Sequence, residues 1–443
     1  DGYGEGSVAV STKIDSFPLW GKVGMGAKES LANQPPPSPS PKGGEKTTIG
    51  EKHMTTYAHN TAIVGVGATE FSKNSGRSEL KLGVEAALAA CADAGINPHE
   101  IDGFCSYVMD KVPEYELARM LGCEEVKFFS QIPHGGGAAA APFMHAAMAV
   151  QTGAAKYVLV YRAMNERSWM RFGTGDYGIK PLPFFDNMNY GWYMPHGFHT
   201  PAAWVAMFAQ RYMHEYGATS EDFGRVSVAV RDFAATNPQA FFYGKPITLE
   251  EHQQSKWICE PLHLLDCCQE SDGAVAMIIT TKERAKDLKQ KPVIIKGAAQ
   301  GMAKDQQSMF SYYRPQISGL PEMGVVAKQL WAQSGLTPAD IQTACIYDHF
   351  TPFVLPQLEE SGFCERGEAK DFIRAGEHAR GGKLPINTNG GQLGEAYIHG
   401  MNGIAEMVRQ VRGTAVNQVA NVENVLATAG TGVPTSGLIL GAE

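Results

Sequence analysis

The sequence predicts an α/β fold built from two duplicated halves, in which strands enclose central helices. The first observation is an internal repeat. Residues 86–107, AALAACADAGINPHEIDGFCSY, align without gaps on residues 326–347, VAKQLWAQSGLTPADIQTACIY, at an offset of 326 − 86 = 240 positions. A glycine-led helix also occurs twice, over residues 134–153 and 389–413, and a strand pattern follows each copy. This duplication indicates two copies of one unit related by a pseudo-twofold axis.

Local patterns define the elements of the first half. Residues 61–71 are an apolar run containing glycines, which predicts a buried strand, and residues 78–95 carry helical apolar spacing between a serine and a glycine. Residues 96–108 predict a short turn and a strand, and residues 156–164 predict another strand. The helix at 134–153 has so little side-chain bulk that it must pack closely on all sides. We therefore expect that helix at the centre of the molecule.

The composition is that of a globular, soluble protein. The chain has 443 residues, 44% of them hydrophobic and 19% charged, which suffices for a large core. We expect two domain-sized halves, residues 54–290 and 291–443. Lys and Arg number 38 against 46 for Asp and Glu, giving a net charge of −8, which argues against a nucleic-acid partner or an acidic membrane surface. No apolar run reaches the roughly 18 residues that a spanning helix needs.

Residues 1–53 differ in composition from the remainder. They include NQPPPSPSPKGGEKTTIGEK, which is rich in Pro, Ser, Gly and Lys and lacks apolar periodicity. Such a segment cannot bury enough surface to order itself, so we expect a disordered N-terminal extension. It has no apolar region typical of a secretory signal, and Met54 directly precedes the first strand pattern, so an upstream segment assigned in error is one interpretation.

The cysteines form no CxxC pair and no metal-ligand spacing with histidine, so we expect no metal site. Free, buried thiols are typical of the reducing cytoplasm. The adjacent Cys267 and Cys268 lie in an apolar setting, where a core role and a redox role are both open. The eight cysteines are Cys91, Cys105, Cys123, Cys259, Cys267, Cys268, Cys345 and Cys364.

A segment rich in aromatic residues, about 165–255, separates the two copies of the repeat. We interpret it as an irregular loop domain, because long loops with many large apolar rings are usually functional. It either covers the substrate or forms part of a dimer interface, and both roles would use aromatic side chains. Its aromatic residues include Trp169, Phe172, Tyr177, Phe184, Phe185, Tyr190, Trp192, Tyr193, Phe198 and Trp204.

The stretch 384–403, LPINTNGGQLGEAYIHGMNG, is the strongest candidate for a functional loop. Gly390, Gly391 and Gly394 would let backbone amides approach a ligand closely. The segment that follows is predicted to be a helix carrying two titratable rings, and its N-terminal N–H groups would favour negative charge. This arrangement suits an oxyanion or an enolate.

Three segments carry a family resemblance: residues 261–285, the YDHF motif at 347–350, and the loop at 387–403. Together they resemble the thiolase superfamily over nearly the whole chain from Thr61. The resemblance implies a five-layered αβαβα fold, an obligate dimer and acyl-CoA substrates.

The sequence departs from that family at its functional positions. The nucleophilic cysteine of thiolases would fall near Gly136, where the chain reads HGGGAA. Tyr397 occupies the position of the catalytic histidine, and Tyr347 replaces the histidine of the HDxF motif found in thiolase-like lipid-transfer enzymes. Thr428 stands near the position of the second cysteine. Without either cysteine the chain cannot form an acyl-enzyme, but it could still stabilise an enolate.

The two tyrosines resemble those of the steroid side-chain-cleaving aldolases of the superfamily. This implies retro-aldol cleavage of a 3-hydroxyacyl-CoA with a tertiary alcohol, giving a ring ketone and propionyl-CoA. Tyr347 and Tyr397 would be the acid/base pair, with His349, Asp348 and His399 as orienting or proton-relaying neighbours. Tyr347 could alternatively be a packing residue, as its repeat partner Tyr107 would be.

Several further residues are predicted to line the pocket. His134 could donate a hydrogen bond to the thioester oxygen, or could serve as a helix cap or a buried structural residue. Glu395 is either a base or a charge favoured by a helix N-terminus. The predicted substrate-binding residues are His134, Gly136, Gly391, Gly394, Gly430 and Gly432.

The resemblance also implies partners. We expect a homodimer that binds two copies of a small acyl-CoA-binding protein with a zinc ribbon and an OB-fold, and no cofactor apart from the acyl-CoA substrate. Two other functions stay open. One is a thiolase or acyltransferase whose nucleophile is a relocated cysteine such as Cys105 or Cys345, although their repeat symmetry suggests packing. The other is a non-catalytic lipid carrier or scaffold.

Overall fold

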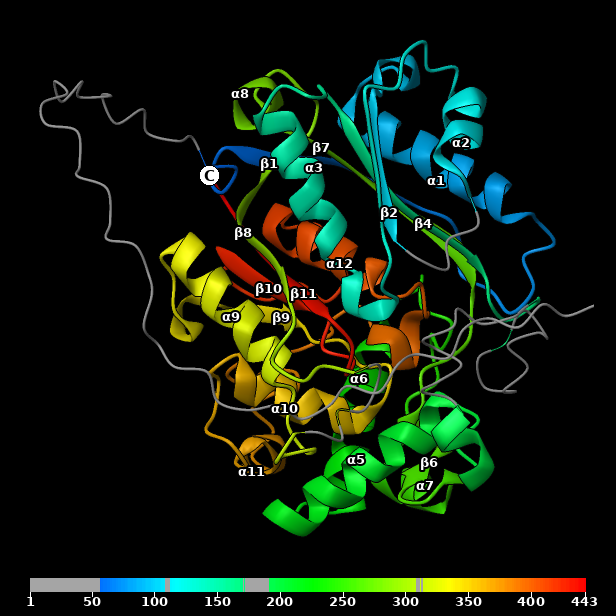
Figure 1. The fold of residues 1–443 in the computed structure, drawn as a ribbon, viewed down its shortest axis with the longest axis vertical. Coiled ribbons are helices and arrows are strands. Elements are labelled where there is room, and N and C mark those ends of the chain that lie inside the picture. Colours follow the sequence, from blue (N-terminus) through cyan, green and yellow to red (C-terminus); the bar gives the residue numbers. More distant parts are fainter. Residues whose placement is uncertain (1–55, 108–111, 170, 172–190, 308–310, 312–313) are drawn as a thin grey trace, which may run out of the picture. The chain divides into compact units, whose positions relative to one another are not determined.

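The computed structural model describes residues 56–107, 112–169, 171, 191–307, 311 and 314–443, so the predicted extension 1–53 lies outside the described residues. The described chain forms one nine-stranded mixed sheet and a two-stranded sheet, β5 (Trp257–Cys259) with β6 (Leu262–His263) (Figure 1). In spatial order, the large sheet consists of β3 (Phe128–Ile132), β2 (Gly103–Tyr107), β4 (Val158–Asn165), β7 (Asp272–Thr281), β1 (Thr61–Ala68), β8 (Val293–Gly301), β11 (Thr435–Gly441), β10 (Asn424–Thr428) and β9 (Thr343–Cys345).

The predicted repeat is confirmed strand by strand. In the first half, β2 pairs parallel with β4, and β7 pairs antiparallel with both β4 and β1. In the second half, β9 pairs parallel with β10, and β11 pairs antiparallel with both β10 and β8. The two halves join where β1 pairs with β8 through Ala62–Ile294 and Ile63–Val293.

The outer edges of the two halves differ. The edge strand β3 pairs along its whole length with β2, and its Phe129 is 65% exposed. The corresponding position in the second half is a single bridge between Ala344 and Ile386. One half therefore ends in a full strand, and the other ends in a short chain segment, residues 385–387, that hydrogen-bonds to β9 around a single bridge.

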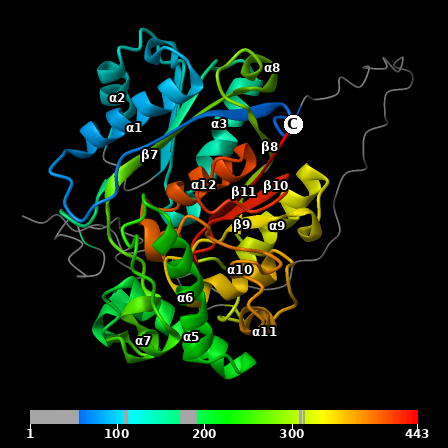
Figure 2. The same ribbon diagram turned by 180° about the vertical axis from the view of Figure 1, so that it is seen from behind.

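Helices lie between and outside the two halves of the sheet, which gives the five layers of a thiolase-like fold (Figures 1 and 2). The central helices α3 (Ala141–Gln151) and α12 (Met401–Arg412) each contact strands of both halves. On the outer faces, α1 (Glu79–Ala94) and α2 (Glu114–Leu121) cover the first half, and α9 (Pro321–Ser334) and α10 (Val354–Glu360) cover the second. The prediction of a buried central helix poor in side-chain bulk is thus confirmed.

Helix ends follow the predicted local chemistry. The Ser78 side chain accepts a hydrogen bond from the Lys81 amide at 3.2 Å and begins α1. Gly95 ends α1 with φ of 76°, and its repeat partner Gly335 ends α9 with φ of 68°. Both residues adopt the left-handed conformation that glycine reaches without a steric penalty.

Close packing in the central layer explains the repeated cysteines. Cys105 and Cys345 both belong to the core cluster that contains α3 and α12. A Cβ added at Gly403 of α12 would overlap the sulfur of Cys345, so the thiol fills the space above a glycine. Burial raises the pKa of both thiols, which disfavours the thiolate that a nucleophile requires. The packing role suggested by the repeat symmetry fits these positions.

The interpretation of residues 165–255 as irregular is wrong over much of the segment. Residues 201–254 contain α5 (Pro201–Tyr216), α6 (Ser220–Thr236) and α7 (Leu249–Gln254). Trp204, Phe208 and Tyr212 recur every four residues along α5, and all three are buried, so they form the apolar face of a helix. The many other aromatic residues in the segment made this helical spacing hard to recognise from the sequence.

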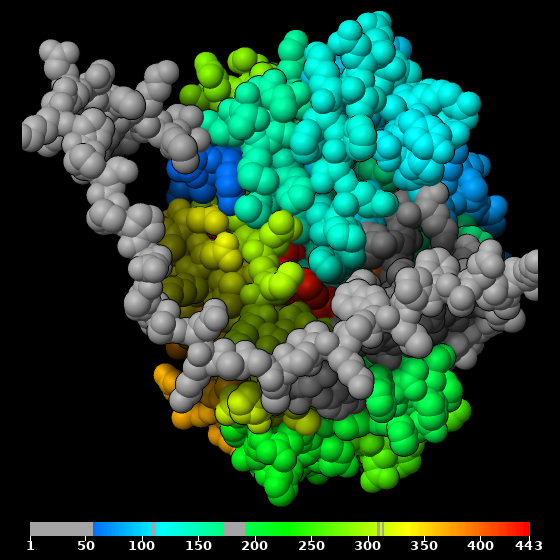
Figure 3. All heavy atoms as spheres, viewed as in Figure 1, coloured from blue at the N-terminus to red at the C-terminus, as the bar shows by residue number. Residues whose placement is uncertain are grey.

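These helices pack against the second half of the molecule. The ring of Phe208 lies 4.6 Å from that of Phe353, measured between centroids. Figure 3 shows the green surface of this region adjoining the yellow and orange surface of the second half. The aromatic residues Phe172, Tyr177, Phe184, Phe185 and Tyr190 lie outside the described residues.

The remaining helices are short: α8 (Lys282–Ala285) follows β7, and α11 (Ala369–Arg374) lies beyond α10. Within the described ranges, no helix combines the length and the apolar character needed to cross a membrane.

Candidate active site

The two predicted tyrosines meet in the central layer. Tyr347 lies two residues beyond β9, and Tyr397 follows a π-helical turn, Gly391–Glu395. Their hydroxyl oxygens are 3.3 Å apart, and both side chains are buried. Residues 50 positions apart therefore form one hydrogen-bonded pair.

Tyr397 and His399 precede the central helix α12 (Met401–Arg412), so the prediction that they lie within a helix is wrong. Ala396 is extended, with φ of −168°. The Tyr397 amide donates to Ser271 Oγ at 3.1 Å, and its backbone bridges Glu270, which fixes the segment beside the start of β7. α12 begins only at Met401, after two left-handed residues. Because the segment is anchored to a strand, its rings face the central layer.

The Tyr347 hydroxyl occupies the space next to Gly136. A Cβ placed on Gly136 would overlap Tyr347 Oη, and one placed on Gly400 would lie 2.8 Å from Tyr347 Cε2. The cysteine that thiolases carry is expected near Gly136. A side chain at this position and the Tyr347 ring therefore exclude each other.

Buried Gln357 of α10 holds the backbone of Tyr347 in place. Its amide donates to the Tyr347 carbonyl at 2.8 Å, while its oxygen accepts from Thr428 Oγ1 at 2.7 Å and from the Gly430 amide at 2.9 Å. Thr428 in turn accepts from the Tyr347 amide at 3.4 Å. The predicted last loop thus reaches the tyrosine through Gln357, which the sequence marks only as a polar residue within an apolar helix.

Burial raises the pKa of both phenols well above the ordinary value for tyrosine. The charges around them differ. The hydrogen bond with Tyr397 and the charge of Arg162 act to lower the pKa of Tyr347, while Tyr107 and Cys268 raise it. Tyr347, Cys268 and Glu166 all raise the pKa of Tyr397 further. Only Tyr347 therefore has neighbours that offset part of the effect of burial.

His349 and His399 flank the tyrosine pair. The His349 ring lies 5.1 Å from Tyr347, and that of His399 lies 5.3 Å from Tyr397. Burial lowers the pKa of His349 to about 3 and that of His399 well below its ordinary value. Neither ring nitrogen of His349 has a hydrogen-bond partner within the described part of the chain. Both histidines are therefore neutral at physiological pH.

Asp348 points into the glycine loop. Its Oδ1 accepts from the Gln392 amide at 2.9 Å, and a Cβ on Gly391, whose φ is 57°, would overlap its Oδ2. Burial raises the pKa of this carboxyl to about 6. The placement explains why position 391 requires glycine. The hydrogen bond between Asp348 and the Gln392 amide holds the loop in position.

The other predicted binding residues lie around this centre. A Cβ on Gly394 would come within 2.6 Å of Ala234 in α6, and one on Gly430 within 2.6 Å of Gln357. Gly432 lines a small cavity with Phe353. His134 is half-buried just before the 3₁₀ turn Gly136–Ala138, and burial lowers its pKa.

A second cavity, of about 470 Å³, contains none of the predicted site residues. Phe198, Met207 and Ile317 contribute to its lining. Because none of the predicted site residues lines this cavity, the buried tyrosine pair stays the candidate centre. No group of three or more His, Cys, Asp or Glu side chains is placed to hold a metal ion in the described ranges.

The site also contains charged residues that the sequence reasoning missed. Arg162 and Glu166 are buried at the end of β4 and beyond it. Lys73 donates to Gln269 Oε1 at 2.9 Å and to the Glu270 carbonyl at 2.6 Å, and burial lowers its pKa to about 8. Buried charges of both signs next to two phenols mark a functional site.

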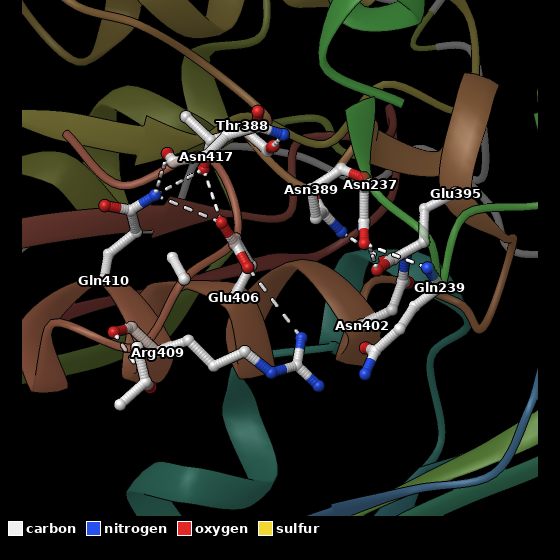
Figure 4. A network of polar contacts seen from close by, with 12 residues as sticks. Asn237, Gln239, Thr388, Asn389, Glu395, Asn402, Glu406, Arg409, Gln410 and Asn417 are labelled. Atoms are coloured by element: carbon white, nitrogen blue, oxygen red, sulfur yellow. Dashed lines mark hydrogen bonds and ion pairs between the residues drawn. The ribbon is translucent and has the colours of Figure 1, made fainter. Parts of the chain in front are cut away.

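Glu395 is the centre of a buried polar network that supports the glycine loop (Figure 4). Its carboxylate accepts hydrogen bonds from Asn389, from Asn402 at 2.9 Å and from Asn237 at 3.3 Å. These residues belong to the loop, to α12 and to the end of α6. Burial is the main cause that raises the pKa of Glu395, to about 7. Glu395 therefore joins three segments and is not a charge at a helix end.

We predict that Gly136→Ala destabilises the fold and displaces the Tyr347 ring, because the added methyl group occupies the space of the hydroxyl. The expected loss is about 1 to 3 kcal/mol in the free energy of unfolding. Denaturant unfolding measures it. Gly191→Ala, where an added Cβ meets nothing within 4 Å, is the matched control. Equal stability of the two variants would contradict the overlap.

We predict that Glu395→Gln changes how stability depends on pH. The folded carboxyl keeps its proton to about pH 7, whereas the unfolded one loses it near its ordinary pKa of 4.5. Between these values the folded state binds more protons, so wild-type stability falls as pH rises. Glutamine cannot titrate. The free energy of unfolding of the variant minus that of the wild type should rise by about 3 kcal/mol between about pH 4 and pH 8.

Chemical denaturation across this range is the measurement. Glu406 has a raised pKa in both proteins, so its contribution cancels in the difference. Glu221→Gln, on an exposed part of α6, removes one charge without entering the network and serves as the control. A difference that does not vary with pH would refute the role of Glu395 burial.

Comparisons with known proteins agree with this geometry. Residues 303–441 match the family model described as "Thiolase C-terminal domain-like". The chain is 65% identical over 380 residues to the 17-hydroxy-3-oxo-4-pregnene-20-carboxyl-CoA lyase of Mycobacterium tuberculosis, covering 86% of this chain and 98% of that protein. It is 64% identical over 390 residues to the steroid side-chain-cleaving aldolase of Thermomonospora curvata, covering 88% and 100%.

A solved structure, the "Ltp2-ChsH2(DUF35) aldolase", superposes with a TM-score of 0.83 at 62% sequence identity, covering 87% of this chain and 98% of that chain. The matched region extends over both halves of the duplicated fold. The chain belongs to the thiolase superfamily, within its branch of steroid side-chain-cleaving aldolases.

Proposed function

We propose that this protein is a carbon–carbon lyase that cleaves a steroid 3-hydroxyacyl-CoA bearing a tertiary alcohol into a ring ketone and propionyl-CoA. The observation that carries the proposal is the buried pair Tyr347–Tyr397, in which one phenol fills the place of the thiolase nucleophile. The relatives named as a pregnene-carboxyl-CoA lyase and a steroid side-chain-cleaving aldolase support the same substrate class.

The chemistry fits a substrate that thiolysis cannot process. A ring carbon that bears a tertiary hydroxyl has no hydrogen and cannot be oxidised to a ketone. A base instead removes the hydroxyl proton, the bond between the ring carbon and the α-carbon breaks, and its electron pair forms the thioester enolate. Protonation of the α-carbon then yields propionyl-CoA. The step needs one base, one acid and donors at the enolate oxygen.

We assign the base to Tyr347 and the acid to Tyr397. Arg162 and the hydrogen bond with Tyr397 act to lower the pKa of Tyr347, whereas the groups around Tyr397 act to raise its pKa. Their hydrogen bond offers a route by which the proton taken from the alcohol can replace the one given to carbon. Burial removes bulk water that would otherwise protonate the enolate nonspecifically.

Neighbouring residues would complete the site. His399, His349 and His134 are candidate donors to the thioester oxygen, and Asp348 holds the glycine loop that forms one wall. Gly136, Gly391, Gly394, Gly430 and Gly432 would shape the pocket for acyl-CoA, which enters as substrate and not as cofactor.

A partner subunit belongs to the proposal. The solved relative is named as a complex with a DUF35 component. We propose that this chain forms a homodimer that binds two copies of such a small acyl-CoA-binding protein, with a zinc ribbon and an OB-fold, in the cytoplasm.

A cysteine-dependent acyltransfer reaction has less support. Cys268 is the thiol whose charge acts on both tyrosines, but burial raises its pKa well above the ordinary value. Cys105 and Cys345 are buried packing residues. None of these thiols is placed in surroundings that favour a thiolate.

The deciding experiment is a product assay on the full chain co-expressed with its small partner, supplied with a steroid 3-hydroxyacyl-CoA and no free CoA. We expect a ring ketone and propionyl-CoA. Tyr347→Phe and Tyr397→Phe should each lower kcat by at least about a hundredfold. Tyr161→Phe, which removes a buried hydroxyl bound to the Val112 carbonyl at 2.7 Å outside the site, is the control.

Two outcomes would contradict the proposal. Turnover that requires a 3-ketoacyl-CoA plus free CoA would indicate a nucleophile and acyl transfer. Binding of acyl-CoA without turnover of either substrate would favour a carrier or scaffold.

A second assay separates the two phenols. Because the acid that protonates the α-carbon is the base for the reverse step, Tyr397 should catalyse exchange of the α-hydrogens of propionyl-CoA with D₂O. We predict that Tyr397→Phe abolishes this exchange and that Tyr347→Phe retains it, as measured by mass spectrometry. The opposite result would reverse the assignment of acid and base.

A further inference from the structure

Arg162 is a fully buried cation in the central layer. It lies on the inner face of β4, and its guanidinium stands 4.5 Å from the centre of the Tyr107 ring. One terminal nitrogen donates to the Tyr107 carbonyl at 2.8 Å, and the other lies 2.7 Å from Nδ1 of His399. A cation with these contacts is held in one orientation by two strands and by the histidine.

The contact to His399 can form in one direction only. A guanidinium carries N–H donors and no acceptor, so His399 Nδ1 must accept the hydrogen bond and cannot itself carry a proton. The single proton of a neutral imidazole then resides on Nε2. A second proton would have to enter Nδ1 against the positive charge of Arg162 and without solvent, which disfavours the imidazolium.

The backbone of His399 is also constrained. Its φ is 54°, in the left-handed region that residues other than glycine rarely adopt. Its carbonyl accepts a hydrogen bond from Tyr107 Oη at 2.7 Å, and the two rings lie 5.7 Å apart. Strain of this kind persists where the surroundings determine the conformation, and such residues cluster at active sites.

We propose that Arg162 is a positioning residue that fixes His399 as a neutral hydrogen-bond donor, with its proton on Nε2, beside Tyr397. His399 then acts as a constant donor and not as a base. The tautomer is a property of the folded chain. Its kinetic consequence rests on the proposed lyase reaction, in which a fixed donor stabilises negative charge at the thioester oxygen.

Arg162 and His349 both favour the neutral form of His399. Arg162 approaches from β4 and Tyr107 from β2, while Tyr397 lies two residues before His399. His349, after β9, opposes a second positive charge. Burial acts in the same direction as these two groups and lowers the pKa of His399.

The direct test is ¹⁵N NMR of the full chain labelled at histidine. His399 is identified as the resonance pair that His399→Gln removes. We expect a protonated Nε2 and an unprotonated Nδ1, with shifts that stay constant between about pH 6 and pH 9. A proton on Nδ1, or titration of His399 in this range, would overturn the proposal, and neither result depends on turnover.

Variants of Arg162 test the consequence. Arg162→Gln should lower kcat by about tenfold or more with little change in KM, and Arg162→Lys, which keeps a charged donor, should restore part of the loss. Tyr107→Phe releases the His399 carbonyl but leaves the Arg162 contact to Nδ1, so it should preserve the tautomer. Loss of the Nε2 tautomer in Tyr107→Phe, or unchanged kcat in Arg162→Gln, would contradict the role of Arg162.

The two proposals can fail separately. If Arg162→Gln does not fold, the wild-type spectrum still decides the tautomer. If the wild-type protein shows the expected tautomer but does not cleave the hydroxyacyl-CoA, the positioning by Arg162 stands and the proposed reaction is wrong.

Discussion

The Tyr347 hydroxyl occupies the small volume that a side chain at position 136 would need, at the start of the central helix segment. With glycine at position 136, the phenol can enter the central layer and reach Tyr397. Any side chain there would push the ring back toward its own strand. Much of the surrounding structure serves to hold the phenol in this space: Gln357 fixes its backbone, Gly400 leaves room for its ring edge, and Asp348 holds the next loop. The glycine at position 136 and the phenol at position 347 thus depend on each other through packing.

The central layer excludes water yet contains ionisable groups, and this combination governs its chemistry. In a medium of low polarity an unpaired charge is costly, so each group either finds a fixed partner or becomes neutral. The guanidinium of Arg162 donates to the Tyr107 carbonyl and to His399 Nδ1. His399 and His349 are neutral. The Glu395 carboxylate accepts hydrogen bonds from three asparagines. The polar side chains therefore have little freedom to reorganise, which is the condition under which fixed donors stabilise a developing charge most effectively.

Sequence periodicity was sufficient to predict the duplicated framework, because each copy carries the same residues that end its helix. Gly95 and Gly335 end equivalent helices, and the regular offset places Tyr107 at the end of β2 and Tyr347 two residues beyond the equivalent strand β9. The meeting of Tyr347 with Tyr397 could be predicted from the family resemblance. The contact between Arg162 and His399 could not be predicted from the sequence, because a single arginine within the apolar run VLVYRAMN gives no indication of the residue that it faces in space. The helices at 201–254 were missed for a related reason: rings spaced every four residues resemble a general aromatic enrichment unless their period is counted.

The duplication is also imperfect in a way that affects assembly. In the first half, the edge strand β3 leaves one row of backbone groups without a partner within the described sheet, whereas in the second half the edge position is reduced to the bridge at Ile386. A molecule with two equivalent open edges could add chains at both ends and grow into a fibre. A molecule with one open edge can pair with one further chain through that edge. Strand addition between identical copies would then join edge to edge about a twofold axis and stop, because the pairing leaves no further edge exposed.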